Sequence, residues 1–157
     1  MDMLSAEFVS FLRAAKLSTY ARQGDDATVA PLLPDSKQLE HSDGRYLYRD
    51  VYVGLLHFVG QEIVYVDGRA VWSMAYSGGL LPGATRSEAS RIYRALRAAL
   101  TASPHEMPLR GPGLFETEGL RYTCTPSGEL RRFRGDERIE SEGRRLYELS
   151  FAGGALG

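Results

Sequence analysis

The sequence contains a single cysteine, Cys124, among its 157 residues. This excludes an internal disulfide and a zinc site built from several thiolates. A strong charge of one sign is also lacking, since 19 basic and 20 acidic side chains give a formal net charge of −1 at pH 7. Nothing in this balance favours direct binding of nucleic acid or of an anionic membrane. The three histidines show no metal-ligand spacing, so no metal site is expected.

Long apolar segments are missing as well. No run approaches the ~18 residues that a membrane-spanning helix requires. The first twenty residues have neither the basic region nor the apolar core of a signal peptide, and we expect a cytoplasmic protein. The glycines of "SGGLLPGATRSEAS" are not followed by the lysine of a phosphate-binding loop, and no cofactor is expected. The length fits one domain over residues 1–157.

Two segments have the apolar spacing of amphipathic helices. In residues 5–19 apolar side chains recur at i, i+3, i+4 and i+7, and Ser5 is placed to cap the first turn. Residues 85–103 predict a second helix, in which Thr85 and Glu88 have the spacing of a capping box. Between the helices, residues 24–44 hold two prolines and many turn formers, and we expect a long loop there.

Two blocks rich in β-branched and aromatic residues, 46–80 and 119–151, predict antiparallel strands. Asp67 and Gly68 separate two apolar runs of the first block. This dipeptide favours a two-residue hairpin turn, because both of its positions adopt a positive φ. The expected cross-strand pairs are Val66 with Arg69 and Val64 with Val71.

Segment 58–81 resembles segment 133–156 at a constant offset of 75 residues. Eight of the 24 positions are identical, whereas unrelated segments would match at about one or two. We therefore expect an α+β fold that is a tandem duplication of a helix followed by three or four antiparallel strands. The repeat units would be about 1–81 and 82–157, as pseudo-two-fold halves sharing a core. Trp72, Met74 and Tyr76 would face that core, and the Gly-Gly pair of each unit would end its strand.

The strings "YRDVYVG", "GQEIV", "VWSMAY", "RGP" with "YTC", and the terminal "FAGG" form a recognisable set. Together they resemble a family of small bacterial domains of unknown function, over nearly the whole chain. The resemblance implies a fold rather than an activity. The resemblance implies that members occur alone or behind a helix-turn-helix regulator domain. We expect no such segment before this domain, and a role on DNA would then need a separate partner. The chain departs from the family at Gly54-Leu55, where members typically carry two glycines.

One predicted strand carries an acid among tyrosines. If "YRDVY" and the tyrosine before it form a regular strand, Tyr46, Tyr48, Asp50 and Tyr52 line one face, and Arg49 points to the other. An acid in such surroundings can bind a cation, a sugar or an amine. In an apolar pocket its pKa would rise, and it could act as a general acid or base.

This cluster is specific to the first unit, since at the offset of 75 Asp50 and Gln61 align with Thr125 and Asp136. The favoured interpretation is a small-molecule-binding or regulatory module with a cleft between the two repeats. The ligand is unidentified, and the residues expected to bind it are Tyr46, Tyr48, Arg49, Tyr52, Gln61, Tyr76 and Arg110.

The alternative is a small cofactor-independent enzyme with Asp50 and Glu62 as acid and base. It requires both carboxylates to reach one cavity. A third hypothesis is assembly through exposed edge strands, with a homodimer as one form. Structural interpretations stand beside these: Glu62 recurs as Glu137 in the second unit and could pair with arginine, and Arg110 could belong to a turn.

Overall fold

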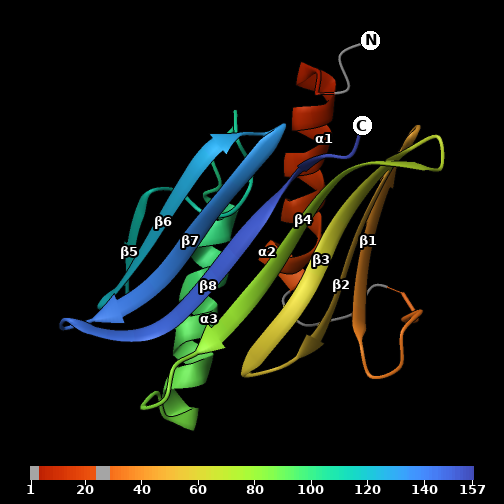
Figure 1. Cartoon of the computed structure of the whole chain (residues 1–157). Coiled ribbons are helices and arrows are strands. Elements are labelled where there is room, and N and C mark those ends of the chain that lie inside the picture. The colour runs from red at the N-terminus through yellow and green to blue at the C-terminus, as the bar shows by residue number, and fades with distance from the viewer. Residues whose placement is uncertain (1–3, 24–28) are drawn as a thin grey trace.

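A computed structural model describes residues 4–23 and 29–157 (Figure 1). The predicted α+β class is confirmed, because helices accompany one antiparallel sheet of eight strands in the order β1-β2-β3-β4-β8-β7-β6-β5. The helices are α1 (Ala6–Ser18), α2 (Tyr20–Gln23) and α3 (Arg86–Thr101). The strands are β1 (Lys37–Asp43), β2 (Tyr46–Gly54), β3 (His57–Val66), β4 (Arg69–Leu80), β5 (Leu114–Thr117), β6 (Leu120–Glu129), β7 (Arg132–Ser141) and β8 (Arg144–Ala155).

Both long helices begin where their capping residues predict. The Ser5 hydroxyl accepts a hydrogen bond from the Phe8 amide at 3.3 Å, and Thr85 and Glu88 form a complete capping box at the start of α3. These contacts satisfy amides that the helix itself leaves without partners. No helix in the described ranges combines the length and apolarity needed to cross a bilayer.

The core lies between the helices and one face of the sheet. Figure 1 shows α1 and α3 on the same side of the sheet. Alternation along β4 points Trp72 and Met74 toward them, and both side chains are fully buried. The opposite face of β4 carries the small, exposed side chains Ala75 and Ser77. The apolar side of the sheet is therefore the side that the helices cover.

Strand β1 corrects the expectation of a loop over residues 24–44. Residues 24–28 lie outside the described residues, but Lys37–Asp43 pairs along its whole length with β2. Its sequence, "KQLEHSD", has too few apolar residues to show a strand period, and Leu39 is its one apolar side chain in the core. Backbone pairing at the edge of the sheet makes this segment a strand, and composition does not reveal that.

The predicted hairpin at Asp67 and Gly68 forms, with positive φ at both positions. Val66 pairs with Arg69 as expected. The second expected pair is wrong, because Val64 lies opposite Trp72 rather than Val71. A β-bulge shifts the register between Val64 and Tyr65, and such an extra residue leaves no trace in the alternation of a short strand.

The Gly-Gly pairs do not end their strands. Strand β4 continues through Gly78 and Gly79 to Leu80, and β8 likewise passes through its glycine pair. A Cβ atom at Gly78 would lie 2.3 Å from the carbonyl oxygen of Glu148 on β8. The glycine is needed because the two central strands approach too closely there for a side chain.

Candidate functional site

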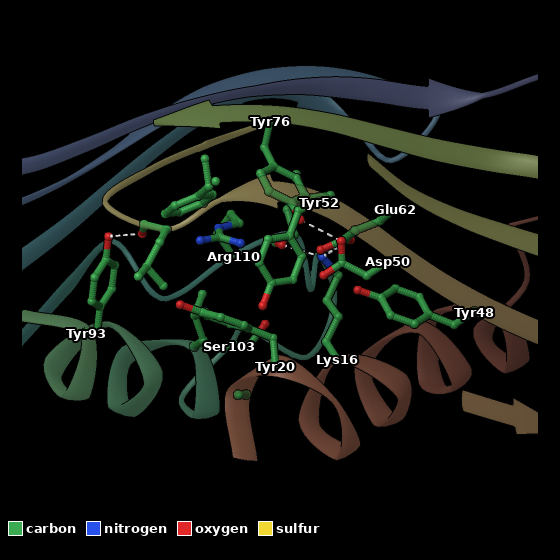
Figure 2. A pocket seen from close by; sticks show the side chains of 16 residues that line it. Lys16, Tyr20, Tyr48, Asp50, Tyr52, Glu62, Tyr76, Tyr93, Ser103 and Arg110 are labelled. Carbon is green, nitrogen blue, oxygen red and sulfur yellow. Dashed lines mark hydrogen bonds and ion pairs between the residues drawn. The ribbon is translucent and has the colours of Figure 1, made fainter. Parts of the chain in front are cut away.

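A cavity of about 40 Å³ lies between the sheet and the helices. Strands β2, β3 and β4 form its roof, and α1, α2, α3 and the segment after α3 close it from the helical side (Figure 2). Among its lining residues Asp50 and Glu62 are at most 4% exposed, whereas Leu55 is 59% exposed and marks the mouth of the cavity. The polar lining side chains are Lys16, Tyr20, Tyr48, Asp50, Tyr52, Glu62, Tyr76, Tyr93, Ser103 and Arg110.

Alternation along β2 places the acid of the cavity. Tyr48, Asp50 and Tyr52 point to the helix-covered face and are at most 6% exposed. Asp50 lies opposite Glu62 in the β2–β3 ladder, so two buried carboxyl groups occupy neighbouring positions on one face. Two like charges so close in an apolar interior are unfavourable unless one is neutralised or protonated.

Lys16 neutralises Glu62. It stands in the last turn of α1, and its Nζ atom lies 2.6 Å from Glu62 Oε2 and 2.6 Å from the carbonyl oxygen of Leu109. The ammonium group also lies 5.9 Å from the centre of the Trp72 ring. Burial lowers the pKa of Lys16 below its usual value, and the charge of Glu62 opposes that effect.

Asp50 has no such cation. Its Oδ1 atom accepts a hydrogen bond from the Tyr76 hydroxyl at 2.6 Å, and among the described residues no basic side chain forms an ion pair with it. Burial, with the charge of Glu62 as second cause, raises the pKa of Asp50 to about 7. The Tyr76 hydrogen bond and the more distant Lys16 and Arg110 charges act in the opposite direction. Asp50 therefore changes its charge near neutral pH.

Arg110 borders the cavity but is held by a second buried network. Its Nη2 and Nε atoms lie 2.5 Å and 3.0 Å from the carboxylate of Glu137, which is fully buried. The hydroxyl groups of Tyr122 and Tyr147 donate to the same carboxylate at 2.6 Å and 2.8 Å. The guanidinium group is thus engaged within the fold, as the structural interpretation of Glu137 expects.

One polar group of the cavity has no partner. The Ser103 side chain is 95% buried, being 5% exposed, and among the described residues its Oγ atom finds no hydrogen bond. At the mouth, the Tyr93 hydroxyl on α3 donates to the carbonyl oxygen of Leu55 at 2.9 Å and so links the helix to the β2–β3 turn (Figure 2). Leu55 itself is 59% exposed.

The model of a domain of unknown function, DUF5680, matches residues 50–156. The chain belongs to this family. No curated protein and no solved structure matches the chain significantly. The expected membership of a family of unknown function is confirmed, and the matched region contains both carboxylates of the cavity but neither Lys16 nor helix α1.

The structure brings most of the predicted site residues together. Tyr48, Asp50, Tyr52, Glu62, Tyr76 and Arg110 all line the cavity. Tyr46 shares their face of β2 but does not reach it, because its ring stacks on Phe11 at a centroid distance of 4.9 Å.

Arg49 and Gln61 lie on the opposite face of the sheet, away from the cavity. Arg49 bonds to Glu40 at 2.7 Å, and Gln61 bonds to the Ser73 hydroxyl at 3.0 Å. Each is adjacent in sequence to a residue that lines the cavity. Because side chains alternate along a strand, both point away from the cavity. Their assignment as ligand-binding residues has no support in this geometry.

Sequence reasoning missed Lys16, Tyr20, Tyr93 and Ser103. Lys16 and Tyr93 lie on helices beside the apolar stripe. A polar side chain at such a position is normally predicted to be exposed to solvent. Ser103 follows the C-terminal end of α3 as an ordinary turn residue. Only the packing of the helices on the sheet directs these side chains inward, so no local signal could have found them.

The side chains that could ligate a metal and the single thiol have the following places among the described residues. Within residues 4–23 and 29–157 no three acidic, histidine or cysteine side chains cluster as a metal site. Cys124 is buried, and burial raises the pKa of its thiol to about 11. A thiol that stays protonated at neutral pH is a poor nucleophile.

Replacing Tyr76 with phenylalanine should raise the pKa of Asp50 further. The tyrosine hydroxyl donates to the carboxylate and favours its charged form, whereas the benzyl ring keeps the packing. Titration of the Asp50 side-chain carbon by NMR in both proteins measures the difference. Tyr93→Phe is the control, since it removes a hydroxyl group at the mouth that does not bond to Asp50. An unchanged or lower pKa in Tyr76→Phe contradicts the prediction.

Proposed function

We propose that this protein is a small-molecule-binding module whose ligand enters the cavity and contacts Asp50 and Ser103. The observation that carries the proposal is the buried Ser103 Oγ atom without a partner in a cavity that also contains Asp50. Buried polar groups are nearly always hydrogen-bonded, so an exception inside a cavity indicates a partner that arrives from outside.

We also propose that the chain is a tandem duplication with halves of about 1–81 and 82–157. The mirrored strand order about the β4–β8 pair supports this, with β1 to β4 on one side and β5 to β8 on the other. The ladders support it too: Asp50 opposite Glu62 corresponds to Cys124 opposite Glu137. This correspondence has an offset of 75 for β3 and 74 for β2. It therefore departs by one residue from the ungapped alignment of β2, which paired Asp50 with Thr125.

The corrected correspondence supports a ligand-binding role for the acid of the first half, Asp50. Tyr48 corresponds to Tyr122, and Glu62 to Glu137, so each half has a buried glutamate near a tyrosine. The hydrogen-bonded pair of Asp50 and Tyr76 corresponds instead to Cys124 and Phe151, which cannot reproduce it. Both members of the pair therefore differ between the two halves. This is expected if the pair binds a ligand and is not required for the fold.

The proposed site also spans the boundary between the halves. Its roof and its acids come from the first half, and α3, Ser103 and Arg110 come from the second. A ligand there would contact both halves and could transmit its presence to a partner domain. A regulatory role, a cytoplasmic location and a homodimer remain predictions alongside it.

A thermal-shift screen of cytosolic metabolites tests the proposed function. A ligand at 100 times its Kd should stabilise the protein by about 2.7 kcal/mol. Ser103→Val, which fills part of the cavity and removes the hydroxyl group, should lose the shift. Ser77→Val makes the same change on the exposed face of β4 and should keep it. The proposal is wrong if no compound shifts the wild-type protein, or if Ser103→Val responds equally.

A second candidate function is acid/base catalysis by Asp50, with Glu62 held by Lys16 as a fixed charge. The observation that favours it is that Asp50 lines the cavity, buried and opposite Glu62. This position raises the pKa of Asp50 to about 7, where a group can both donate and accept protons efficiently. NMR of the same metabolites incubated with the protein tests it. Turnover that Asp50→Asn abolishes while binding persists would establish an enzyme, and unchanged metabolites would leave only binding.

A further inference from the structure

We infer that the ligand of this cavity is a monocation, a primary ammonium group joined to an apolar group. The inference rests on the proposed function and names the chemical class of its ligand. Three observations on the cavity support it: the balance of buried charges, the engagement of the two basic side chains, and a lining that combines buried acids with apolar side chains.

The buried charges do not balance. Three carboxyl groups, those of Asp50, Glu62 and Glu137, are at most 4% exposed. Among the described residues, two basic groups face them: Lys16 pairs with Glu62, and Arg110 pairs with Glu137. Asp50 is the remaining acid, and a buried charge without a partner is costly. A ligand with one positive charge would complete the set.

An anionic ligand does not fit the same cavity. The Lys16 ammonium group already contacts Glu62 and the Leu109 carbonyl oxygen. The Arg110 guanidinium group binds Glu137 through two nitrogen atoms. The charge of each cation is already neutralised by a buried carboxylate, and the anion would also approach Asp50. A ligand carboxylate at Arg110 would therefore compete with Glu137 for the guanidinium group.

The remaining lining suits an ammonium group on an apolar body. The ring of Tyr52, two positions along β2 from Asp50, lines the cavity, and aromatic ring faces attract cations; the Tyr76 ring already lies under the Arg110 guanidinium group. The Ser103 hydroxyl group can accept one N–H bond that Asp50 does not take. The apolar side chains of Leu55, Phe58 and Leu100 also line the cavity, with the exposed Leu55 at its mouth. The free volume of about 40 Å³ has room for a few heavy atoms, so the charged end would lie inside and the apolar part would lie in the mouth.

Binding of three matched probes tests the class of ligand. Phenethylamine is the cation, 2-phenylethanol its neutral counterpart and 3-phenylpropionate an anion of similar shape. Affinities measured at pH 8 by NMR titration should rank the amine at least tenfold above the alcohol, with no binding of the carboxylate. Asp50→Asn should reduce the affinity for the amine at least tenfold and leave that for the alcohol within about twofold.

The pH profile separates a charge interaction from simple packing. Asp50 faces Glu62 on β3, Tyr48 on β2, Tyr76 on β4, Lys16 on α1 and Arg110 after α3. The pKa of Asp50 is raised to about 7, while the probe ammonium stays protonated there as a lysine does. Affinity for the amine should fall about tenfold per pH unit below pH 7 and level off above it.

The controls distinguish failure of this inference from failure of the proposed function. Asp136→Asn, the same change on the exposed face of β7, should bind the amine as the wild-type protein does. If the alcohol or the carboxylate binds as tightly as the amine, or if Asp50→Asn retains the amine, the ligand class is wrong and the binding cavity stands. If no probe and no metabolite binds, both proposals are overturned.

Discussion

Replacing Glu137 with alanine is expected to lower the free energy of unfolding by about 3–5 kcal/mol. The carboxylate is fully buried and is the acceptor for Arg110, Tyr122 and Tyr147. Its loss leaves a buried guanidinium charge without a partner and two hydroxyl groups without acceptors. Urea denaturation followed by circular dichroism measures the change as a lower midpoint at similar slope.

The matched control is Glu116→Ala. Glu116 also pairs with an arginine, Arg121, at 2.9 Å, but both side chains are more than half exposed. Such a pair contributes about 0–1 kcal/mol. Glu137→Gln keeps the shape and loses the charge, so its stability should lie between that of the alanine variant and the wild type. A loss in Glu137→Ala no larger than in Glu116→Ala would show that the network does not stabilise the fold.

Replacing Asp50 with asparagine is expected to stabilise the protein at pH 8 relative to the wild type. Because the pKa of Asp50 is about 7 when folded and near 3.8 when unfolded, the folded state holds the proton more tightly. Stability from this group is present at low pH and is lost as the pH rises from about 4 to 7. The loss is about 2–4 kcal/mol and persists above pH 7. The asparagine side chain stays neutral at every pH, so the variant does not lose this stability.

Chemical denaturation between pH 4 and pH 9 measures this effect as the difference between the two proteins. The difference should grow in favour of Asp50→Asn up to about pH 7 and then remain constant. Asp136→Asn reports the same substitution at an exposed position, and its difference from the wild type should stay small throughout. A difference that does not depend on pH would mean that Asp50 is already charged at pH 4 in the folded protein.

Much of the secondary structure could be predicted from the sequence, because its signals lie within short segments. Both helix starts follow from capping residues, and the core face of β4 follows from strict alternation of large side chains. The strand β1 and the bulge opposite Val64 could not be predicted. The first is stabilised by pairing with a distant segment, and the second is a single extra residue.

The candidate site could also be predicted only in part. Alternation correctly placed Tyr48, Asp50 and Tyr52 on one face of β2. The same rule correctly placed Arg49 on the opposite face, where it bonds to Glu40. Lys16 could not be foreseen, because its distance from Glu62 in the chain is bridged only by the packing of α1 on the sheet. Pairings of this kind depend on the fold and not on spacing.

The Lys16–Glu62 pair has a consequence for how this domain can be recombined. The family match begins at Asp50, so a module cut at the bounds of that match contains the buried Glu62 without the lysine that neutralises it. A chimaera that exchanges the N-terminal helix for one without a lysine at this position must acquire another cation or replace Glu62. The boundary of a usable module therefore lies upstream of the match and includes α1 and β1.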